Sequence, residues 1–213
     1  MKKILSRIVS RSTLIALVSA SSLCVSTQSG FCVLPAFVTW DPSVGGNGHQ
    51  YRAVPGFTGL TWDMANTLAQ QQGGYLASIT SAAENNFVFG LINSSPFFNS
   101  FNGAGPAIGG YQTDSLAEPA GHWAWTSGEA WSYTSWGAGL PNNIPPGPDK
   151  LIYYSGIGST PASTWDDLPG NDAGAFGVGI GGYVVEVVPE PSSLAIIGCG
   201  LLLFTRRSTA KRQ

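Results

Sequence analysis

The sequence predicts an α+β domain in the middle of the chain, on three observations. Two helical segments come first, at residues 62–72 and 81–92. Short strand-like segments rich in Gly, Asn and aromatic residues follow, without another long helix. Strand patterns also stand near both ends of the domain, at 48–54 and 182–187, so the first and last strands are expected to pair.

Each helix has a start signal of its own. The first has apolar residues at helical spacing, Thr61 as a candidate N-cap and the pair Gly73-Gly74 as a stop. The second opens on Ser81 and Glu84, the spacing of a capping box, in which each side chain binds the other residue's backbone N–H. Both helices are expected to act as scaffold.

Strands and one long loop account for the rest of the domain. The segment 48–54 is predicted to be an edge strand, because Pro55-Gly56 ends it, and further short strands are expected at 75–79, 107–112 and 122–126. Residues 137–164 are rich in Pro and Gly, and a loop of that length usually carries function. The prediction is two helices, small antiparallel sheets and a long loop region.

The charges are concentrated at the two ends of the chain. Of ten Lys and Arg residues only Arg52 and Lys150 lie between residues 37 and 187, together with eleven Asp and Glu residues, a formal net charge of −9. Binding to phosphates needs clustered Lys and Arg. Nucleic acid is therefore excluded as a partner, and cations or neutral ligands are favoured.

Residues 1–36 are typical of a secretory signal peptide. A basic start precedes the apolar run 14–18, and small residues follow it. The three cysteines, Cys24, Cys32 and Cys199, all lie outside residues 37–187. We therefore expect an exported domain without disulfides, held together by its core and by any bound ion.

Residues 188–213 form a tail of a different kind. Pro189-Glu190-Pro191 precedes the apolar segment 194–204 and a basic end, and that segment is shorter than the roughly 20 residues of a membrane-spanning helix. The order resembles the PEP-CTERM sorting tail of Gram-negative bacteria. The resemblance implies that an exosortase processes the tail and that the tail contacts the membrane before processing. It also implies a final place at the cell surface, outer membrane or extracellular matrix. A plain C-terminal anchor is the alternative.

The central segment, from about residue 40 to 187, resembles a C-type lectin-like domain. Its opening helix, strand and second helix match that family in order, and four later motifs follow: Ala107-Ile108-Gly109-Gly110, Gly121-His122-Trp123-Ala124-Trp125, Leu140-Pro141-Asn142-Asn143 and Trp165-Asp166-Asp167. The resemblance implies a C-type-lectin-like fold and a binding protein rather than an enzyme.

In that family the last two motifs surround a calcium ion, which prefers six to eight oxygen ligands and in turn holds two sugar hydroxyls. The resemblance implies a calcium and sugar site at Asn142, Asp166 and Asp167, with Asp149 as a substitute acid from the loop.

Two positions depart from the family's pattern, since Leu140 and Pro148 stand where acidic or amide ligands are expected. Asp172 is a further acid close to the site in sequence. Whether calcium binds is therefore open, and the sugar preference of the family does not carry over.

Two functions follow from the resemblance. The first is binding of carbohydrate, such as an exopolysaccharide, with or without calcium. The second is a metal-free protein-interaction or structural matrix component. A hydrolase is supported only by the acidic surface, since no catalytic motif is recognisable.

Aromatic residues and histidines are assigned to packing first. Trp123 and Trp125 are expected in the core, whereas Trp131 and Trp136 serve either as core and loop anchors or as sugar-stacking surfaces. His49 and His122 stand alone in sequence, without metal-ligand spacing, which favours surface or packing roles.

Overall fold

The computed structural model describes residues 33–189, apart from 115, 117–118, 144–148, 159 and 170–178. Except for Val33, these residues belong to one compact unit that begins at Leu34. Several segments with predictions lie outside the described residues. They are most of the expected signal peptide, the Pro-rich part of the long loop with Pro148, the residue Asp172, and the tail from Glu190 onward. The predictions made for those segments stay predictions.

Strand β8 (Gly182–Val187) is the centre of the sheet. It pairs antiparallel with β2 (Gln50–Pro55) and with the short β3 (Tyr75–Leu76), and parallel with β4 (Ala104–Gln112). The prediction that the first and last strands of the domain meet is confirmed by the β2–β8 pairing. This pairing brings the two ends of the domain side by side.

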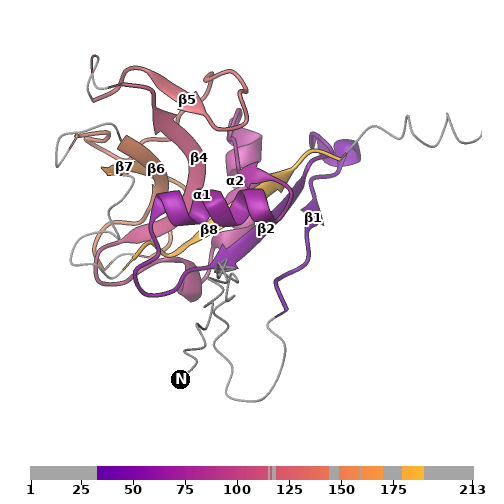
Figure 1. Ribbon diagram of the computed structural model, residues 1–213, viewed down its shortest axis with the longest axis horizontal. Coiled ribbons are helices and arrows are strands. Elements are labelled where there is room, and N and C mark those ends of the chain that lie inside the picture. The colour runs from indigo at the N-terminus through magenta and orange to yellow at the C-terminus, as the bar shows by residue number, and fades with distance from the viewer. Residues whose placement is uncertain are drawn as a thin grey trace, which may run out of the picture. The chain divides into compact units, whose positions relative to one another are not determined.

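The other strands extend the sheet in both directions. β1 (Val38–Thr39) pairs with β2, β5 (Trp123–Trp125) and β6 (Asp149–Tyr154) pair with β4, and β7 (Trp165–Pro169) pairs with β6. Among the described residues the main path runs β1-β2-β8-β4-β6-β7, a single mixed sheet where small antiparallel sheets were expected (Figure 1). The edge-strand prediction for 48–54 is wrong for the start of the strand, because β1 pairs with Gln50 and Tyr51 of β2.

The two predicted helices are present as α1 (Trp62–Gln71) and α2 (Ala82–Ile92), with 3-10 turns η1 (Pro42–Val44) and η2 (Ser95–Phe97). Thr61 caps α1, because its hydroxyl accepts from the backbone N–H of Met64. Only half of the predicted capping box forms: the Ser81 hydroxyl accepts from the N–H of Glu84, but the Glu84 carboxylate accepts from Thr80. No helix in the described ranges is long and apolar enough to cross a membrane.

Both faces of the central strand are buried. Tyr183 and Val185 belong to one apolar cluster and Val184 to the other, as the alternation of side chains along a strand requires. α1 covers the first face and crosses in front of β8 and β4 in Figure 1, whereas α2 packs on the second. Members of the first cluster include Trp62, Ala65, Ala69 and Leu76; members of the second include Tyr51, Val88, Ile92, Trp125 and Trp165.

Two glycines give a matched test of this packing. A methyl group at Gly181 would collide with the backbone carbonyl of Phe97, whereas a methyl group at Gly90, on α2, meets no atom within 4 Å. We expect Gly181→Ala to lower the free energy of unfolding by about 1–3 kcal/mol or more, because a backbone atom cannot give way. Gly90→Ala should raise it by about 0.5–1 kcal/mol, since alanine loses less conformational freedom in a helix.

Urea unfolding of both variants measures the two changes. Equal free energies of unfolding for the two variants would show that Gly181 does not pack against Phe97 of η2 as described.

Candidate functional site

The beginning of the long loop, with the residues just before it, lies against the start of β7. The backbone N–H of Trp165 donates to the carbonyl of Ser135 (2.8 Å), and the N–H of Gly137 donates to the carbonyl of Trp165 (2.9 Å). Leu140 then closes a turn onto the Gly137 carbonyl (3.1 Å). These bonds fix the path of the segment that carries Leu140 and Asn142.

The carboxylate of Asp167 holds the tip of this segment. One oxygen accepts from the backbone N–H of Asn142 and the other from that of Asn143, both at 2.8 Å. The Leu140-Pro141 peptide is cis and Asn143 has a positive φ of 52°, a conformation that asparagine tolerates better than most residues. Asp167 is itself buried, at 6% exposure, so its role here is to fasten the loop.

Asp166 lies beside this fastening and is only partly buried. One of its oxygens accepts from the backbone N–H of Asp167 (2.9 Å). Burial, followed by the charge of Asp167, raises the pKa of the Asp166 carboxyl to about 7. This carboxyl can accept a hydrogen bond from a ligand when it is ionised and donate one when it is protonated.

The other two predicted site residues differ in exposure. Asn142 is exposed at the loop tip. Asp149 is 1% exposed on β6, opposite Pro169 of β7, and its backbone N–H donates to the side chain of Gln112 (3.0 Å). The structure thus brings Asn142, Asp166 and Asp167 together at the loop, with Asp149 inside the neighbouring strand pair.

The described donors do not fit a calcium ion at this place. Leu140 has no side-chain oxygen, and each oxygen of Asp167 already accepts an amide hydrogen. The described residues hold no group of three or more His, Cys, Asp or Glu side chains placed to bind a metal.

Aromatic rings form the floor beneath the loop. Trp165 is fully buried and meets Trp125, Tyr133 and Trp136 edge-on, with ring centroids 5.9, 5.6 and 6.1 Å away. Trp131 stacks on Trp123 at 5.6 Å. Core positions for Trp123 and Trp125 are confirmed, and Trp131 and Trp136 pack against the same cluster, as their loop-anchoring interpretation requires.

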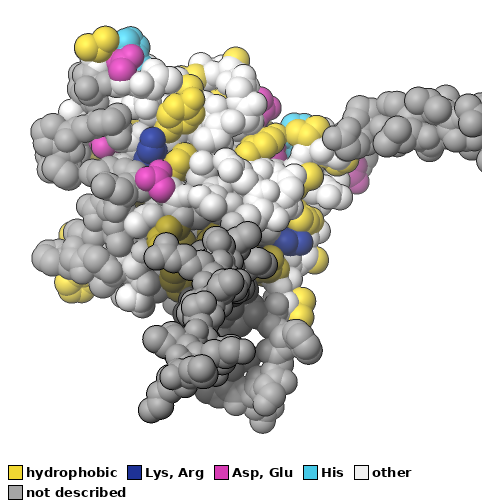
Figure 2. Space-filling model, in the orientation of Figure 1, with side chains coloured by type: hydrophobic (Ala, Val, Ile, Leu, Met, Phe, Trp, Pro, Cys, Tyr) yellow, Lys and Arg dark blue, Asp and Glu magenta, His cyan; other side chains and the backbone are white. Residues whose placement is uncertain are grey.

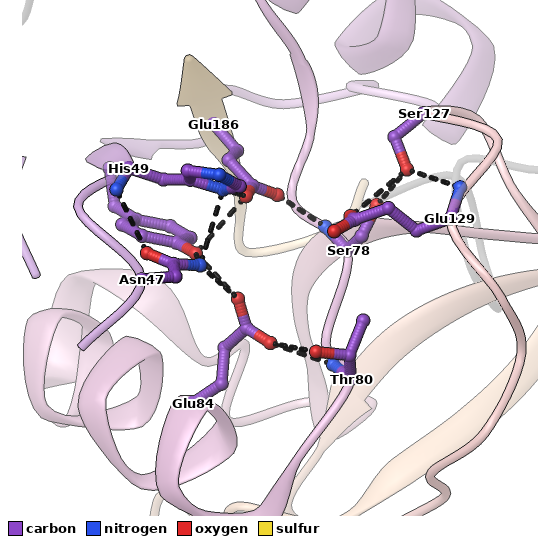
Figure 3. A network of polar contacts seen from close by, with 9 residues as sticks. Asn47, His49, Ser78, Thr80, Glu84, Ser127, Glu129 and Glu186 are labelled. Carbon is purple, nitrogen blue, oxygen red and sulfur yellow. Dashed lines mark hydrogen bonds and ion pairs between the residues drawn. The ribbon is translucent and has the colours of Figure 1, made fainter. Parts of the chain in front are cut away.

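A second polar cluster was not foreseen from the sequence and is drawn in Figure 3. At its centre is Glu186 of β8, which is fully buried. One carboxylate oxygen lies 2.5 Å from Nδ1 of His49 and accepts from the hydroxyl of Tyr51 (3.1 Å), and the other accepts from the backbone N–H of Ser78 (2.9 Å). His49, which stands alone in the sequence, is therefore hydrogen-bonded within the fold, as the packing role predicted for it requires.

Glu84 of α2 completes this buried cluster. Its carboxylate accepts from Tyr51 (2.5 Å), from the side chain of Asn47 (3.1 Å), and from the N–H and hydroxyl of Thr80 (2.7 and 2.8 Å). His122 likewise has a carboxylate partner, since its Nδ1 lies 2.6 Å from Asp114. The sequence signal for Glu186 was a charged residue within the apolar run 183–187, a position that is buried by alternation.

Burial raises the pKa of Glu186 to about 7, although the N–H of Ser78 and His49 act in the opposite direction. Glu84 and Glu186 are buried between β2, α2 and β8, whereas Asn47 at the margin of the cluster is exposed.

Comparison with known proteins adds the class of the domain. No family model matches the chain. Curated relatives include a type-2 ice-structuring protein of Brachyopsis segaliensis (30% identical over 53% of this chain and 55% of its own), human lithostathine-1-alpha (33%, over 54% and 63%) and lectin BRA-3 of Megabalanus rosa (24%, over 74% and 85%). The chain therefore spans about half to three fifths of the length of the first two.

Solved structures show the same fold. Human lithostathine matches with a TM-score of 0.51 at 24% identity, over 76% of this chain and all of that one. The carbohydrate-recognition domain of the mouse scavenger receptor C-type lectin matches with a TM-score of 0.50 at 18% identity, over 75% and 100%.

The described domain thus has the C-type lectin-like α+β fold. The relatives are named as lectins, lithostathines and ice-structuring proteins, which agrees with the expectation that the chain is not an enzyme.

The pKa of Glu186 leads to a prediction about pH. An acid whose pKa is higher in the folded than in the unfolded state stabilises the fold at low pH and loses that contribution as pH rises. The window runs from the ordinary value of 4.5 to about 7, and the loss is on the order of 3 kcal/mol at most. Melting temperature should therefore fall between pH 5 and pH 8, and Glu186→Gln should flatten the fall.

Asp166 titrates in the same range, so Asp166→Asn should remove a separate part of the fall. Asp63→Asn changes an exposed carboxyl on α1 and is the control. An unchanged slope in Glu186→Gln would show that Glu186 does not bind its proton in this window.

The loop fastening gives a second prediction at this site. Asp167→Asn keeps one carbonyl oxygen but places an NH₂ group against the N–H of Asn142 or Asn143, so we expect a loss of about 1–3 kcal/mol in the free energy of unfolding. At pH 8 Asp166→Asn should be neutral or stabilising, because it removes a partly buried charge. Urea unfolding of both variants at pH 8 measures the two changes. Equal losses in the free energy of unfolding would contradict the assignment of the loop fastening to Asp167 alone.

Proposed function

We propose that the protein is an exported bacterial surface or extracellular-matrix protein whose C-type lectin-like domain binds carbohydrate. The single observation that supports it most is the loop tip, where the exposed Asn142 lies on a backbone that is fastened by Asp167, the neighbour of Asp166 in β7. Amide and carboxyl groups at a rigid surface suit the many hydroxyls of a sugar. A relative named as a lectin, BRA-3, supports the same ligand class.

The mode of binding proposed here is independent of calcium. The described donors do not form a calcium site, and Asp167 makes by direct hydrogen bonds the connection between loop and strand that an ion could otherwise make. The proposed ligand contacts are therefore Asn142 and Asp166, with Asp167 and the buried Asp149 behind them.

The ends of the chain complete the proposal. We take residues 1–36 as the signal peptide, 37–187 as the binding domain and 188–213 as a sorting tail with Pro189, Glu190 and Pro191 as its motif. An exosortase would process the tail, and the membrane would be a contact only before that step. Nucleic acid is not a proposed partner, because charged side chains are few and scattered on the face in Figure 2 and the domain is acidic overall.

A protein-interaction or structural matrix role is the second candidate. Leu140 favours it, because an aliphatic side chain beside Asn142 adds apolar contact area and offers sugars no hydrogen bond. The bonds from Asp167 and Trp165 fix the backbone of residues 137–143 in the same way for either kind of ligand.

A glycan array with the purified protein tests the proposal, run once with calcium and once with chelator. We expect the same glycans to bind in both conditions, and Asn142→Ala to weaken binding about tenfold, the effect of losing one hydrogen bond of roughly 1.4 kcal/mol. Asn93→Ala, an exposed asparagine at the end of α2, is the matched control and should bind normally.

Binding to no glycan in either condition would sink the carbohydrate proposal and leave the protein-interaction role. Binding that needs calcium, together with a rise in melting temperature on adding calcium, would contradict the calcium-independent mode.

A further inference from the structure

Asn85 of α2 connects the helical scaffold to residues 135–143, which are called the ligand loop below. It is 2% exposed, and its side chain makes contacts in three other parts of the domain. Its oxygen accepts from the hydroxyl of Tyr153 (2.8 Å) on β6 and from the indole N–H of Trp165 (3.1 Å) on β7. Its NH₂ group donates to the carbonyl of Ser163 (3.0 Å) and lies 3.4 Å from the hydroxyl of Ser135.

These contacts need both halves of an amide. Trp165 can only donate, and burial raises the pKa of Tyr153 well above its ordinary value, so both groups require an acceptor. The Ser163 carbonyl can only accept and requires a donor. A side-chain amide can accept two hydrogen bonds and donate two from one planar group, which is the combination required at position 85.

The partners of Asn85 are also the residues that hold the loop. Ser135 and Trp165 bond to each other through their backbones, and the Ser135 hydroxyl donates to the Ser163 carbonyl (3.1 Å). The backbone carbonyl of Trp165 accepts from the N–H of Gly137. Two residues further along β7, the carboxylate of Asp167 accepts from the backbone N–H groups of Asn142 and Asn143. A shift of Trp165 would therefore disturb its backbone bonds to Ser135 and Gly137 and would reach Asp167, which lies two residues further along the same strand.

We propose that Asn85 is a positioning residue for the ligand loop: its amide sets the place of Trp165, and Trp165 sets the path of residues 135–143. This assigns a functional role to α2, which the sequence indicated as scaffold alone. The positioning itself does not depend on the nature of the ligand, whereas its effect on affinity rests on the proposed function.

Hydrogen exchange of the full-length protein tests the positioning directly. In Asn85→Leu we expect the amides of Gly137, Leu140, Asn142 and Asn143 to exchange about tenfold faster than in the wild type, since exchange reports local opening. Glu84→Gln is the matched control: the neighbouring buried residue on the same helix loses carboxylate bonds in a different cluster. It should leave exchange in 135–143 unchanged once global stability is taken into account.

Asn85→Asp keeps the proposal testable if Asn85→Leu does not fold. Its ionised carboxylate would face the Ser163 carbonyl without a donor, whereas the protonated form restores one. Protection of 135–143, relative to the wild type at the same pH, should therefore recover as pH falls, a response that a general loss of packing would not produce.

Equal loop exchange in Asn85→Leu and Glu84→Gln, or no pH-dependent recovery in Asn85→Asp, would overturn the positioning role. The glycan array decides the proposed function separately: wild-type protein that binds no glycan but shows the expected exchange pattern would refute carbohydrate binding and retain the positioning role. Where a glycan does bind, Asn85→Leu should lower its affinity about tenfold while Glu84→Gln leaves it unchanged.

Discussion

The pairing of β8 with β2 is the constraint on which the rest of the domain depends. It joins the first long strand to the last, and β8 also carries β3 and β4, so every other strand is attached to it directly or through one of these. Because both faces of β8 are buried, a charged residue on this strand has to find its partners inside the protein. Glu186 finds them in His49, Tyr51 and Ser78.

Buried polar clusters of this kind join strands and helices of the domain that no disulfide joins. The sequence has no cysteine between Cys32 and Cys199, so no disulfide can join the described strands and loops. Glu186 and Glu84 connect β2, α2 and β8 through shared hydrogen bonds to Tyr51, and Asn85 connects α2 to β6 and β7. Buried networks in which the polar atoms are satisfied specify one arrangement of their elements, at the cost of burying charge.

The sequence located both helices and the strands β2, β3, β4, β5 and β8, but not β1, β6 and β7, nor the polar contacts between the elements. β6 lies within residues 137–164, which were expected to form a loop. Helical spacing and Thr61 located α1, and alternation located β8, because these signals are local. The partner of Glu84 could not be inferred in this way: Ser81 at capping-box spacing suggested a local bond, but Thr80 and Tyr51 compete for the same carboxylate and the latter comes from another element. His49 and Glu186 are 137 residues apart and meet only once the sheet has formed.

The candidate site shows the same division between local and long-range information. Trp165-Asp166-Asp167 and the loop motif were correctly expected to lie together, but the sequence could not reveal that Asp167 binds backbone amides. That arrangement separates support from recognition: Asn85, Trp165 and Asp167 are buried and hold the loop, whereas Asn142 faces solvent. Substitutions at the exposed position cost the fold little, because no described bond of the scaffold uses the Asn142 side chain. The side chain at position 142 can therefore vary while the backbone of residues 137–143 stays fixed by buried groups.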